Sequence, residues 1–449
     1  MTHKSRSEFI KSFFEILEEK KIPYVVLRNY DGLPDRVGND IDMLVTENEL
    51  NNYGRLLCSL GLEKGWYLCD KQKRYGFASY IFFNGNKPSQ TLKWDVWAPI
   101  TWKGLTWVDT EFVMNNRILH KNGFYIPPKG VEAATLVLKE ILQNGTIREK
   151  NYRQIKKFAP EDPESFKMVL TKYFNDKIID KLLYNSIHGN WNKIRKDHKK
   201  TRNNLAFNSL VNEKLLFPLK IFNFFWGHIK EKSSSEVMVF VCLIGPDGSG
   251  KTTISSSIRG TAKSIFKKTY YFHGHYGVFP EFKNMMPSNK YKKIGRDIEE
   301  KMDKKTPNGI VPHFLVFYYS LEYIIGYYYL KYKNRNKKTF MVFDRYFYDY
   351  LIQPGPFKIN NIFIRVLLRI VPHPDILLFL KSPPELVYER KPELAVTEID
   401  RQLRICSTIS NHFDFSQDID NTLNLSRVKN DIRDSIYSKT SKKVFKRIN

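Results

Sequence analysis

The sequence predicts an α/β protein of two domains, an α+β domain with a helical extension followed by a domain built on a doubly wound parallel sheet. Three observations support this fold class. The chain has 449 residues, more than one hydrophobic core usually fills. Short strands alternate with helices early in the chain, and uninterrupted apolar strands begin at Val237. We therefore expect a first domain over 1–115, a helical extension and basic connection over 116–204, an amphipathic linker over 205–235 and a second domain over 236–449.

The composition predicts a folded chain that suits anionic partners. Hydrophobic residues make up 42% and aromatic residues 14% of the chain, which excludes general disorder. The formal net charge of +26 would suit a nucleotide, nucleic acid, an acidic glycan or the anionic face of a membrane. Because the lysines are scattered along the whole chain, we do not expect a nucleic-acid partner from charge alone. The oligomeric state stays open.

Cysteine usage and apolar stretches bear on the compartment. The four cysteines form no CxxC pair and have no neighbouring histidine at metal spacing, so neither a disulfide scaffold nor a zinc site is indicated. The opening residues read as an amphipathic helix and not as a signal peptide. The stretch 314–330 contains Glu322 and many tyrosines and is about a turn too short to span a bilayer. We expect a cytoplasmic protein and leave peripheral contact with the inner face of the membrane open.

The elements of the first domain follow from periodicity and turn residues. A helix is expected to about Lys20, and a later helix ends at Asn144-Gly145. A further helix is expected to start at Pro163. The polar stretch 186–204 and the aromatic amphipathic stretch 205–229 read as the interdomain connection. Period-two and β-branched patterns predict strands at 24–27, 41–45, 80–83 and 91–97.

The second domain begins with the apolar run VMVFVCLI at 237–244, which has no polar alternation and predicts a strand buried on both faces of a parallel sheet. Similar strands are expected at 340–343 and 376–380, with helical sequence between them. The segment 283–308, rich in Lys, Asn, Pro and Met, reads as a loop over the site.

A glycine-rich motif, GPDGSGKTT, follows the first of these strands at 245–253. A strand that turns through glycines into a helix points several backbone N–H groups at one spot, which suits a triphosphate. Lys251 would reach the β- and γ-phosphates, and the Thr252 hydroxyl would bind Mg²⁺. We therefore predict ATP and Mg²⁺ as cofactors, with an ATP site formed by Gly245, Gly248, Ser249, Gly250, Lys251, Thr252 and Thr253.

Two charged residues follow the strand at 340–343. Asp344 comes at its carboxyl end, where ligands bind in open α/β sheets, and is placed to hold Mg²⁺ or its water. Arg345 would clamp a phosphate through two hydrogen bonds. The alternative is a surface Asp-Arg pair.

Together, GPDGSGKTT, FDRYFYDYL and PDILLFLKSPPELVYERK resemble the thymidylate kinase-like branch of P-loop kinases over about 237–410. The resemblance implies that Asp247 contacts the acceptor and that Arg345 binds an acceptor phosphate. It also implies that a lid arginine closes over the transferred group, a role for which Arg390 is best placed. With Lys251, these residues form the predicted catalytic set. Lys391, Arg401 and Arg404 are weaker candidates, because basic residues on a helix usually form a solvated face.

The chain departs from that family after its second strand, where YYFHGHYGVFPEF replaces the Arg-Glu-Pro-Gly-Gly segment of thymidylate kinases. Thymidylate is therefore not the expected acceptor. His273 and His275, two apart on an aromatic strand, would face one acceptor pocket. The alternative is that they are structural histidines.

Three carboxylates mark the first domain. Asp40 and Asp42 stand two apart on a strand and project from one face, and Asp95 on another strand would join them. Such a trio suits a two-metal site that activates a hydroxyl against an α-phosphate. The segment 5–110 resembles the polymerase β type of nucleotidyltransferase, although Arg28-Asn29 stands where that fold carries Gly-Ser.

Two readings of the first domain stay open, an active nucleotidyltransferase and a folded domain that is inactive or only binds substrate. Arg28 is expected either to hold a phosphate or to pair with Asp31 or Asp35. For the whole chain we expect an enzyme that transfers phosphate from ATP to a small-molecule or glycan acceptor, a sugar or alditol of a bacterial surface-polysaccharide pathway. A nucleoside monophosphate kinase and an ATP-gated binding module at membrane or nucleic acid are the alternatives.

Overall fold

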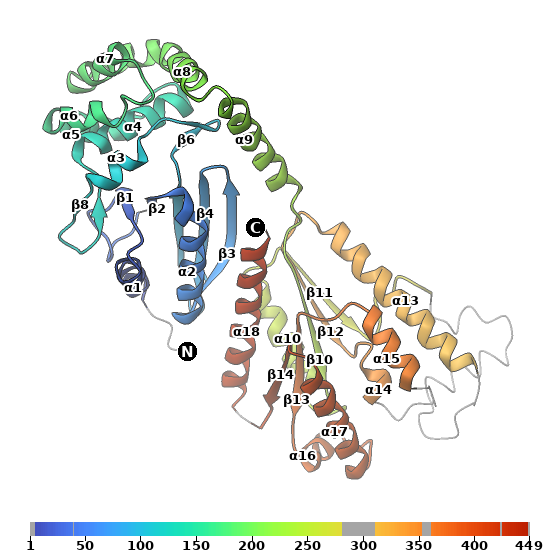
Figure 1. Cartoon of the computed structure of the whole chain (residues 1–449). Helices are drawn as coiled ribbons and strands as arrows, with labels where there is room; N and C mark the ends of the chain where they lie inside the picture. The colour runs from blue at the N-terminus through green and yellow to red at the C-terminus, as the bar shows by residue number, and fades with distance from the viewer. Residues whose placement is uncertain (1–4, 39, 281–309, 353–360, 423, 448–449) are drawn as a thin grey trace. The chain divides into compact units, whose positions relative to one another are not determined.

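The computed structural model describes residues 5–38, 40–280, 310–352, 361–422 and 424–447. These residues form an α/β protein, as the sequence predicts, with one mixed and one fully parallel five-stranded sheet (Figure 1). They divide into two compact units, the first comprising Met1–Ser234 with Val444–Asn449 and the second Ser235–Lys443. The segment 283–308, predicted to be a loop over the site, lies outside the described residues.

The mixed sheet of the first unit contains the strands β1 (Tyr24–Arg28), β2 (Ile41–Val45), β3 (Trp66–Arg74), β4 (Phe77–Asn84) and β5 (Thr91–Trp97). Their spatial order is β1-β2-β5-β4-β3. Neighbours β2 and β5 run parallel and the other pairs antiparallel. The structure has strands at all four predicted positions and adds β3, whose polar second half, DKQKR, hides its strand character.

Alternation along β1 divides the apolar residues between the two faces of the sheet. Tyr24 stacks on Phe14 of α1 (Arg6–Glu19), with ring centroids 5.6 Å apart. Val25 and Leu27 belong to a core on the opposite face, together with Leu44 of β2. A strand places successive side chains on opposite faces, so one short strand serves both layers. The short helix η1 (Glu47–Glu49) and α2 (Leu50–Glu63) complete this part of the fold.

A helical layer shares the core that contains Val25 and Leu27. The predicted helix ending at Asn144-Gly145 is α4, and Gly145 closes it with a φ of +72°. The helices are α3 (Thr110–Asn115), α4 (Lys129–Asn144), α5 (Glu149–Glu161), α6 (Pro163–Met168), α7 (Asp176–Ile187), α8 (Trp191–Glu213) and α9 (Leu216–Ser233). Two small hairpins accompany them, β6 (Thr101–Trp102) with β7 (Leu105–Thr106) and β8 (Ile118–Leu119) with β9 (Tyr125–Ile126).

The stretch 186–204, predicted as a polar, basic connection, is mostly helical in α8. The buried residues of α8 are Ile194, Thr201, Leu205 and Ser209. Their spacing of seven, four and four residues places them along one helix face. Two of the four are small and polar, so this face carries little hydrophobic signal in the sequence.

Helix α9 is fixed to the first unit by backbone and side-chain contacts. A Cβ atom at Gly104 would come within 2.5 Å of the Lys220 carbonyl oxygen, so the β6–β7 turn and α9 touch through bare backbone. Ile221 packs against the core, and Arg74 of β3 forms an ion pair of 2.6 Å with Glu231. One side of α9 is therefore held against the protein.

The second unit is built on five parallel strands, β10 (Met238–Ile244), β11 (Lys268–His273), β12 (Thr339–Asp344), β13 (Ile376–Lys381) and β14 (Ser416–Asp420). All seven residues of β10 are buried, as expected for a central strand covered on both faces. Strands β10, β12 and β13 confirm the three predicted strands. β14, with the sequence SQDID, carries no apolar run that would reveal it.

The strand order β11-β12-β10-β13-β14 creates a switch point at the carboxyl end of β10. From β10 the chain goes to one side to form β11 and β12, and it later crosses to the other side to form β13 and β14. Connections that leave neighbouring strands in opposite directions open a crevice between their carboxyl ends. The crevice therefore lies where the motif at 245–253 begins.

The helices of the second unit are α10 (Lys251–Ala262), α13 (Ile310–Lys333), α14 (Asp349–Ile352), α15 (Asn361–Ile370), α16 (Pro384–Arg390), α17 (Val396–His412) and α18 (Leu425–Lys446). The tyrosine-rich stretch 314–330 lies within α13. In the part of the chain that the structure describes, no helix combines the length and apolarity required to cross a bilayer.

Replacing Gly104 with alanine is expected to destabilise the first unit by about 3 kcal/mol, because a positive φ of +87° adds to the contact with the Lys220 carbonyl. Gly123→Ala is the matched control, since its φ is +80° with no atom within 4 Å of the added Cβ, and we expect a cost of about 1 kcal/mol. Urea unfolding of the full chain followed by circular dichroism measures both. Equal losses would contradict a close backbone contact between the hairpin and α9.

Candidate active sites

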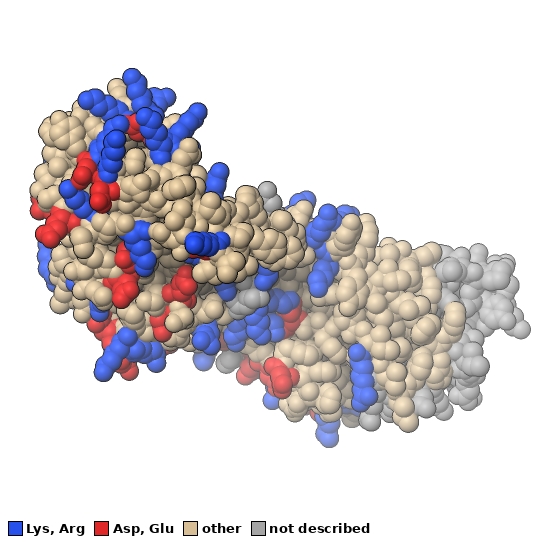
Figure 2. Space-filling model, turned by 45° about the horizontal axis from the view of Figure 1, so that its top comes forward, with Lys and Arg blue, Asp and Glu red and all other residues tan. Residues whose placement is uncertain are grey.

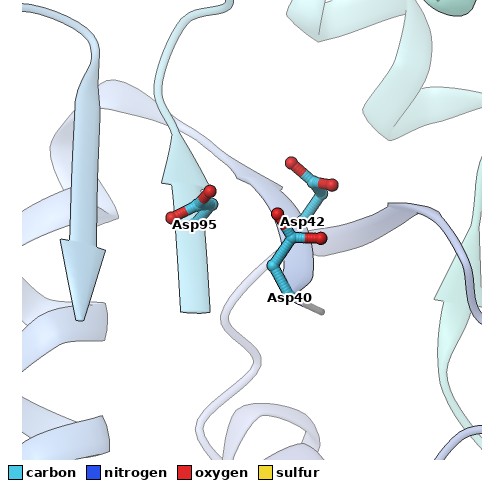
Figure 3. A group of neighbouring side chains, drawn as sticks. All are labelled: Asp40, Asp42 and Asp95. Atoms are coloured by element: carbon cyan, nitrogen blue, oxygen red, sulfur yellow. The ribbon is translucent and has the colours of Figure 1, made fainter. Parts of the chain in front are cut away.

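The three predicted carboxylates of the first unit come together at neighbouring strands. Asp42 of β2 is the register partner of Asp95 of β5, and Asp40 directly precedes β2. One oxygen from each side chain lies within 4.8 Å of the others (Figure 3). Asp42 and Asp95 are only 1% and 7% exposed. The cluster is therefore a largely buried group of three acids.

Three cations compensate these acids. Arg28 donates from Nε to Oδ2 of Asp42 at 2.5 Å, and Lys139 Nζ lies 3.6 Å from the other oxygen. Lys93 Nζ lies 2.6 Å from Asp95. Arg28 therefore pairs with Asp42 and not with the expected Asp31 or Asp35. The reason is register, since Arg28 and Asp42 face each other across β1 and β2.

The pKa values of Asp42 and Asp40 are shifted in opposite directions. Burial would raise the pKa of Asp42, but Lys139 and Arg28 outweigh it and lower the pKa below its ordinary value. Burial, with Asp42 beside it, raises the pKa of Asp40. Of these two acids, Asp42 is thus the more firmly ionised, and a bound cation would affect Asp40 more.

The donor set fits a divalent cation. Oxygens on opposite sides of such an ion lie about 4–5 Å apart, which the three carboxylates satisfy. Ser79 donates to Oδ1 of Asp95 at 2.6 Å and orients that carboxylate. Oδ1 of Asp42 is buried and accepts no hydrogen bond of ordinary geometry from the described residues. Asp40, Asp42 and Asp95 would hold Mg²⁺, and Lys93 would compete with it.

A small pocket adjoins Asp42. Its wall combines two cations, Arg28 and Lys139, with the ring of Trp97 and the amide of Gln143. Cations suit phosphate and an indole suits a flat ring. The acids therefore stand at the edge of a small pocket whose lining combines positive charge with an aromatic ring.

In the second unit, the glycines of the motif are required by its geometry. Gly248 and Gly250 adopt φ values of +89° and +90°. A Cβ atom at Gly250 would lie 2.7 Å from Nδ2 of Asn421, and one at Gly248 would lie 2.9 Å from the Val387 carbonyl. Asn421 in turn donates to the Ser249 carbonyl at 2.6 Å. Only glycine fits at these two positions of the turn.

Lys251 bends back over the loop that precedes it. Its Nζ donates to the carbonyls of Gly245 at 2.8 Å and Pro246 at 3.0 Å and lies 3.3 Å from Asp247. Thr252 and Thr253 are exposed on the first turn of α10. Ser249 is fully buried, and its hydroxyl has no hydrogen-bond partner among the described residues.

Asp247 gathers three cations. Arg345 donates a short hydrogen bond to it, Lys251 approaches one oxygen, and Lys391 Nζ lies 3.4 Å from the other. Burial would raise the pKa of Asp247, but Lys251, Arg345 and Lys391 lower it to about 2. Arg345 adopts a φ of +66°, a strained backbone for a residue with a side chain. The hydrogen bond to Asp247 places the guanidinium beside the loop.

Asp344 ends β12 level with Leu243 of β10 and His273 of β11. It is 2% exposed, and its Oδ1 has no hydrogen-bond partner within the described chain. Its other oxygen receives a long hydrogen bond of 3.4 Å from Tyr271. A buried carboxylate with an unsatisfied oxygen at this edge fits a site for Mg²⁺ or its bound water.

The two histidines differ from the expected arrangement. β11 ends at His273, so His275 lies outside the strand, and Gly274 between them has a φ of +79°. Because of this turn, the two rings lie beside different acids. His273 Nδ1 lies 3.8 Å from Asp344, and His275 Nδ1 lies 3.6 Å from Glu322. His275 also stacks on Tyr319, with ring centroids 4.1 Å apart. The expectation that both lie on one strand is wrong.

The candidate lid residues occupy different environments. Arg390 is exposed at the end of α16, whereas its neighbour Lys391 contacts Asp247. Arg401 and Arg404 form ion pairs within α17, to Glu398 and Asp400. Among the basic candidates, Lys391 is the one that the structure brings to the loop.

Three further residues of the two sites were not predicted. Asp349 of α14 lies 4.0 Å from Arg345, five residues after Asp344, where the repeated aspartate in DRYFYDY is the signal. Lys139 interrupts the apolar run of α4, and a charge on an otherwise buried face would reveal it. Asn421 follows the polar strand β14, which the sequence hides.

No family model matches this chain, and a search of curated proteins found no match either. The function proposed below accordingly rests on the residues and geometry described above.

The full chain is expected to bind Mn²⁺, used as a probe for Mg²⁺, at the first-unit cluster. Asp95→Asn should weaken this binding by at least about tenfold, because one of three anionic ligands is lost. Lys93→Met should strengthen it, because a competing cation within 4 Å of two of the acids is removed. Titration followed by electron paramagnetic resonance measures both.

The matched control for Mn²⁺ binding is Glu63→Gln, which changes a carboxylate that is 67% exposed and outside the cluster. Unchanged affinity in Asp95→Asn, or weaker binding in Lys93→Met, would contradict a cation site at these residues.

Proposed function

We propose that the second unit is an ATP-dependent phosphotransferase of the thymidylate kinase-like type. The acceptor we propose is a hydroxyl of a small sugar, an alditol or a glycan. The observation that carries this proposal is the turn from buried strand β10 through Gly248 and Gly250 into α10, with Lys251 folded over it. This arrangement offers backbone N–H groups, a helix N-terminus and one cation at a single spot, which suits a triphosphate.

In the proposed reaction, Lys251 exchanges its present contacts with backbone carbonyls for phosphate oxygens of ATP. Because those carbonyls hold Nζ above the loop, little side-chain ordering is needed. Asp344, with its unsatisfied oxygen, and Thr252 are the residues that would hold Mg²⁺. The bound ion would neutralise charge on the phosphates.

Charge balance near the loop favours a hydroxyl acceptor over a phosphate acceptor. The cations Lys251, Arg345 and Lys391 face the acids Asp247, Asp344 and Asp349, so ionisation of all three acids leaves no surplus positive charge. Arg345 already donates to Asp247. A phosphate monoester would require surplus cations, whereas a neutral sugar requires hydrogen-bond acceptors, which carboxylates supply.

Asp349 is the proposed acceptor of the hydroxyl proton. Burial raises its pKa to about 7, opposed by Lys251 and Arg345, so the carboxylate is a stronger base than an ordinary aspartate. The acceptor oxygen would bond to the γ-phosphorus as the bond from that phosphorus to the β,γ-bridging oxygen breaks. The hydroxyl proton would pass to Asp349, and ADP would leave.

For the first unit we propose a nucleotidyltransferase-like role in a consecutive step. The buried trio Asp40, Asp42 and Asp95 beside a cationic, indole-lined pocket supports it. Bound divalent ions would supply Lewis acidity to an α-phosphate. Arg28 and Lys139 would hold the negative charge of the nucleotide, and Ser79 would keep Asp95 oriented.

Lys251→Ala is expected to lower acceptor-dependent ATP turnover at least about a hundredfold, because a preorganised cation on the transferred phosphate is lost. The experiment incubates the full chain with ATP, Mg²⁺ and panels of sugars, alditols and nucleoside monophosphates, and follows product mass. Lys263→Ala, an exposed lysine at the other end of α10, is the matched control. Full activity in Lys251→Ala would refute the proposed site.

The panel also separates the rival functions. Phosphorylation of a nucleoside monophosphate alone would identify the alternative kinase. Binding of ATP without turnover on any acceptor would favour a binding module.

The turnover rate is expected to rise with pH through about 7, because Asp349 accepts a proton only when ionised and its raised pKa delays ionisation to that range. Asp349→Asn should remove this rise and lower the rate by about a hundredfold or more. Asp400→Asn, a solvent-facing acid of α17, is the control. A pH profile that persists in Asp349→Asn would assign the proton to another group.

A further inference from the structure

The end of α8 and the whole of α9 expose large apolar side chains on the surface of the first unit. Of the large hydrophobic residues of this unit that the structure describes as exposed, ten lie between 207 and 229 and only four lie elsewhere. Monomeric soluble proteins rarely expose contiguous apolar patches of this extent without a binding role. None of these ten residues belongs to the residues described for either candidate active site.

Five exposed residues, one just before α9 and four within it, form one row. Leu215, Leu219, Phe222, Trp226 and Ile229 recur at intervals of four, three, four and three residues, which places them along one side of a helix. They are 90%, 51%, 59%, 55% and 54% exposed, respectively. Exposed Phe207 and Leu210 precede this row on the last turns of α8.

The same helix also packs an apolar side against the protein. Ile221 and Phe217 contact the core of the first unit, and the backbone at Lys220 touches Gly104. The exposed row is therefore not the face that holds α9 in place. A contiguous exposed row of this length is typical of a surface that a ligand covers.

Basic residues precede and accompany the row: six lysines and arginines lie at 193–202 on α8, and four lysines lie at 214–232. Between 191 and 233 the sequence has ten lysines and arginines and three acidic residues. Lys214 and Lys230 are exposed at the two ends of the row. Figure 2 shows lysine and arginine side chains crowded over the part of the first unit where α8 lies. The partner of the apolar row should therefore carry negative charge next to an apolar phase.

Anionic phospholipid surfaces combine these two properties. A helix of 18 residues is about 27 Å long and lies along the interface when only one side is apolar and exposed. Phenylalanine and tryptophan favour the headgroup level, and lysines flanking the row would reach anionic headgroups. A protein groove would supply the apolar phase but offers no general reason for seven net positive charges in the segment.

We propose that α9, with the last turns of α8, is a docking surface for an anionic lipid bilayer. The apolar row lies in the headgroup region, and the basic residues of the segment contact acidic headgroups. The helix lies on the bilayer and does not cross it, in keeping with the absence of a spanning helix among the described residues. Docking requires neither candidate active site.

The test uses the full chain and vesicles of phosphatidylcholine alone or mixed with phosphatidylglycerol, with binding measured by co-flotation. We expect binding to the mixed vesicles that weakens as salt rises. Phe222→Ser/Trp226→Ser should bind at least about tenfold more weakly. The matched control, Ile118→Ser/Leu119→Ser, changes two exposed apolar residues on β8 of the same unit and should bind as the wild type does.

Other outcomes would overturn the proposal. Equal binding of the two double variants, or no binding by the wild type, would exclude a lipid role for α9. A wild type that forms dimers, with the α9 variant monomeric and no vesicle binding, would assign the row to contact between two copies. Circular dichroism of each variant verifies that it folds. Kinase activity is not a readout here, so failure of the proposed function would leave this test unaffected.

Discussion

Burial of an acid next to compensating cations organises both candidate sites. Asp42 is buried and Asp247 is half-buried, and in each case lysine and arginine outweigh the cost of burial and lower the pKa. An uncompensated buried charge would cost several kcal/mol, so removing one cation would affect the whole cluster. The strands place the acids, and neighbouring elements must then supply the cations. Lys139 of α4 and Arg345 after β12 meet this requirement.

The same constraint has a chemical consequence. A cluster whose charges already balance attracts a ligand only if the ligand replaces one of the partners. Phosphates would draw Lys251 away from the loop carbonyls and a divalent ion would displace Lys93 from the acids, so binding at either site requires exchange of ion pairs. Both sites should therefore respond to ligands by small side-chain movements on a fixed backbone.

Much of the fold could be predicted because most of its strands have a recognisable hydrophobic pattern in the sequence. β10, with seven buried residues, and the alternating strands of the mixed sheet carry their pattern in the sequence. The three acids could be found because period-two spacing and register determine their position. In contrast, β3 and β14 contain polar runs, and α8 buries small polar residues such as Thr201, so local hydrophobicity does not reveal them. His275 was predicted on β11, but this strand ends at His273 because Gly274 adopts a left-handed conformation.

The cations beside the acids were harder to predict, since ion-pair partners depend on tertiary packing. Lys139 is nearly a hundred residues from Asp42 in the chain, and only the packing of α4 on the sheet joins them. Lys391 and Asp349 likewise reach the loop through the arrangement of helices after β12 and β13. A single sequence identifies the acids of a site more readily than the groups that tune them.

The backbone contact at Gly104 gives α9 a mechanical property. Two main chains that touch without intervening side chains cannot slide past each other, and the ion pair from Arg74 to Glu231 secures the end of the helix. A surface that α9 contacts would therefore be bound by a rigid part of the first unit and not by a flexible segment. The first unit would then bind that surface in a single orientation. The pocket beside its three carboxylates would keep a fixed orientation toward any substrate that diffuses along the surface.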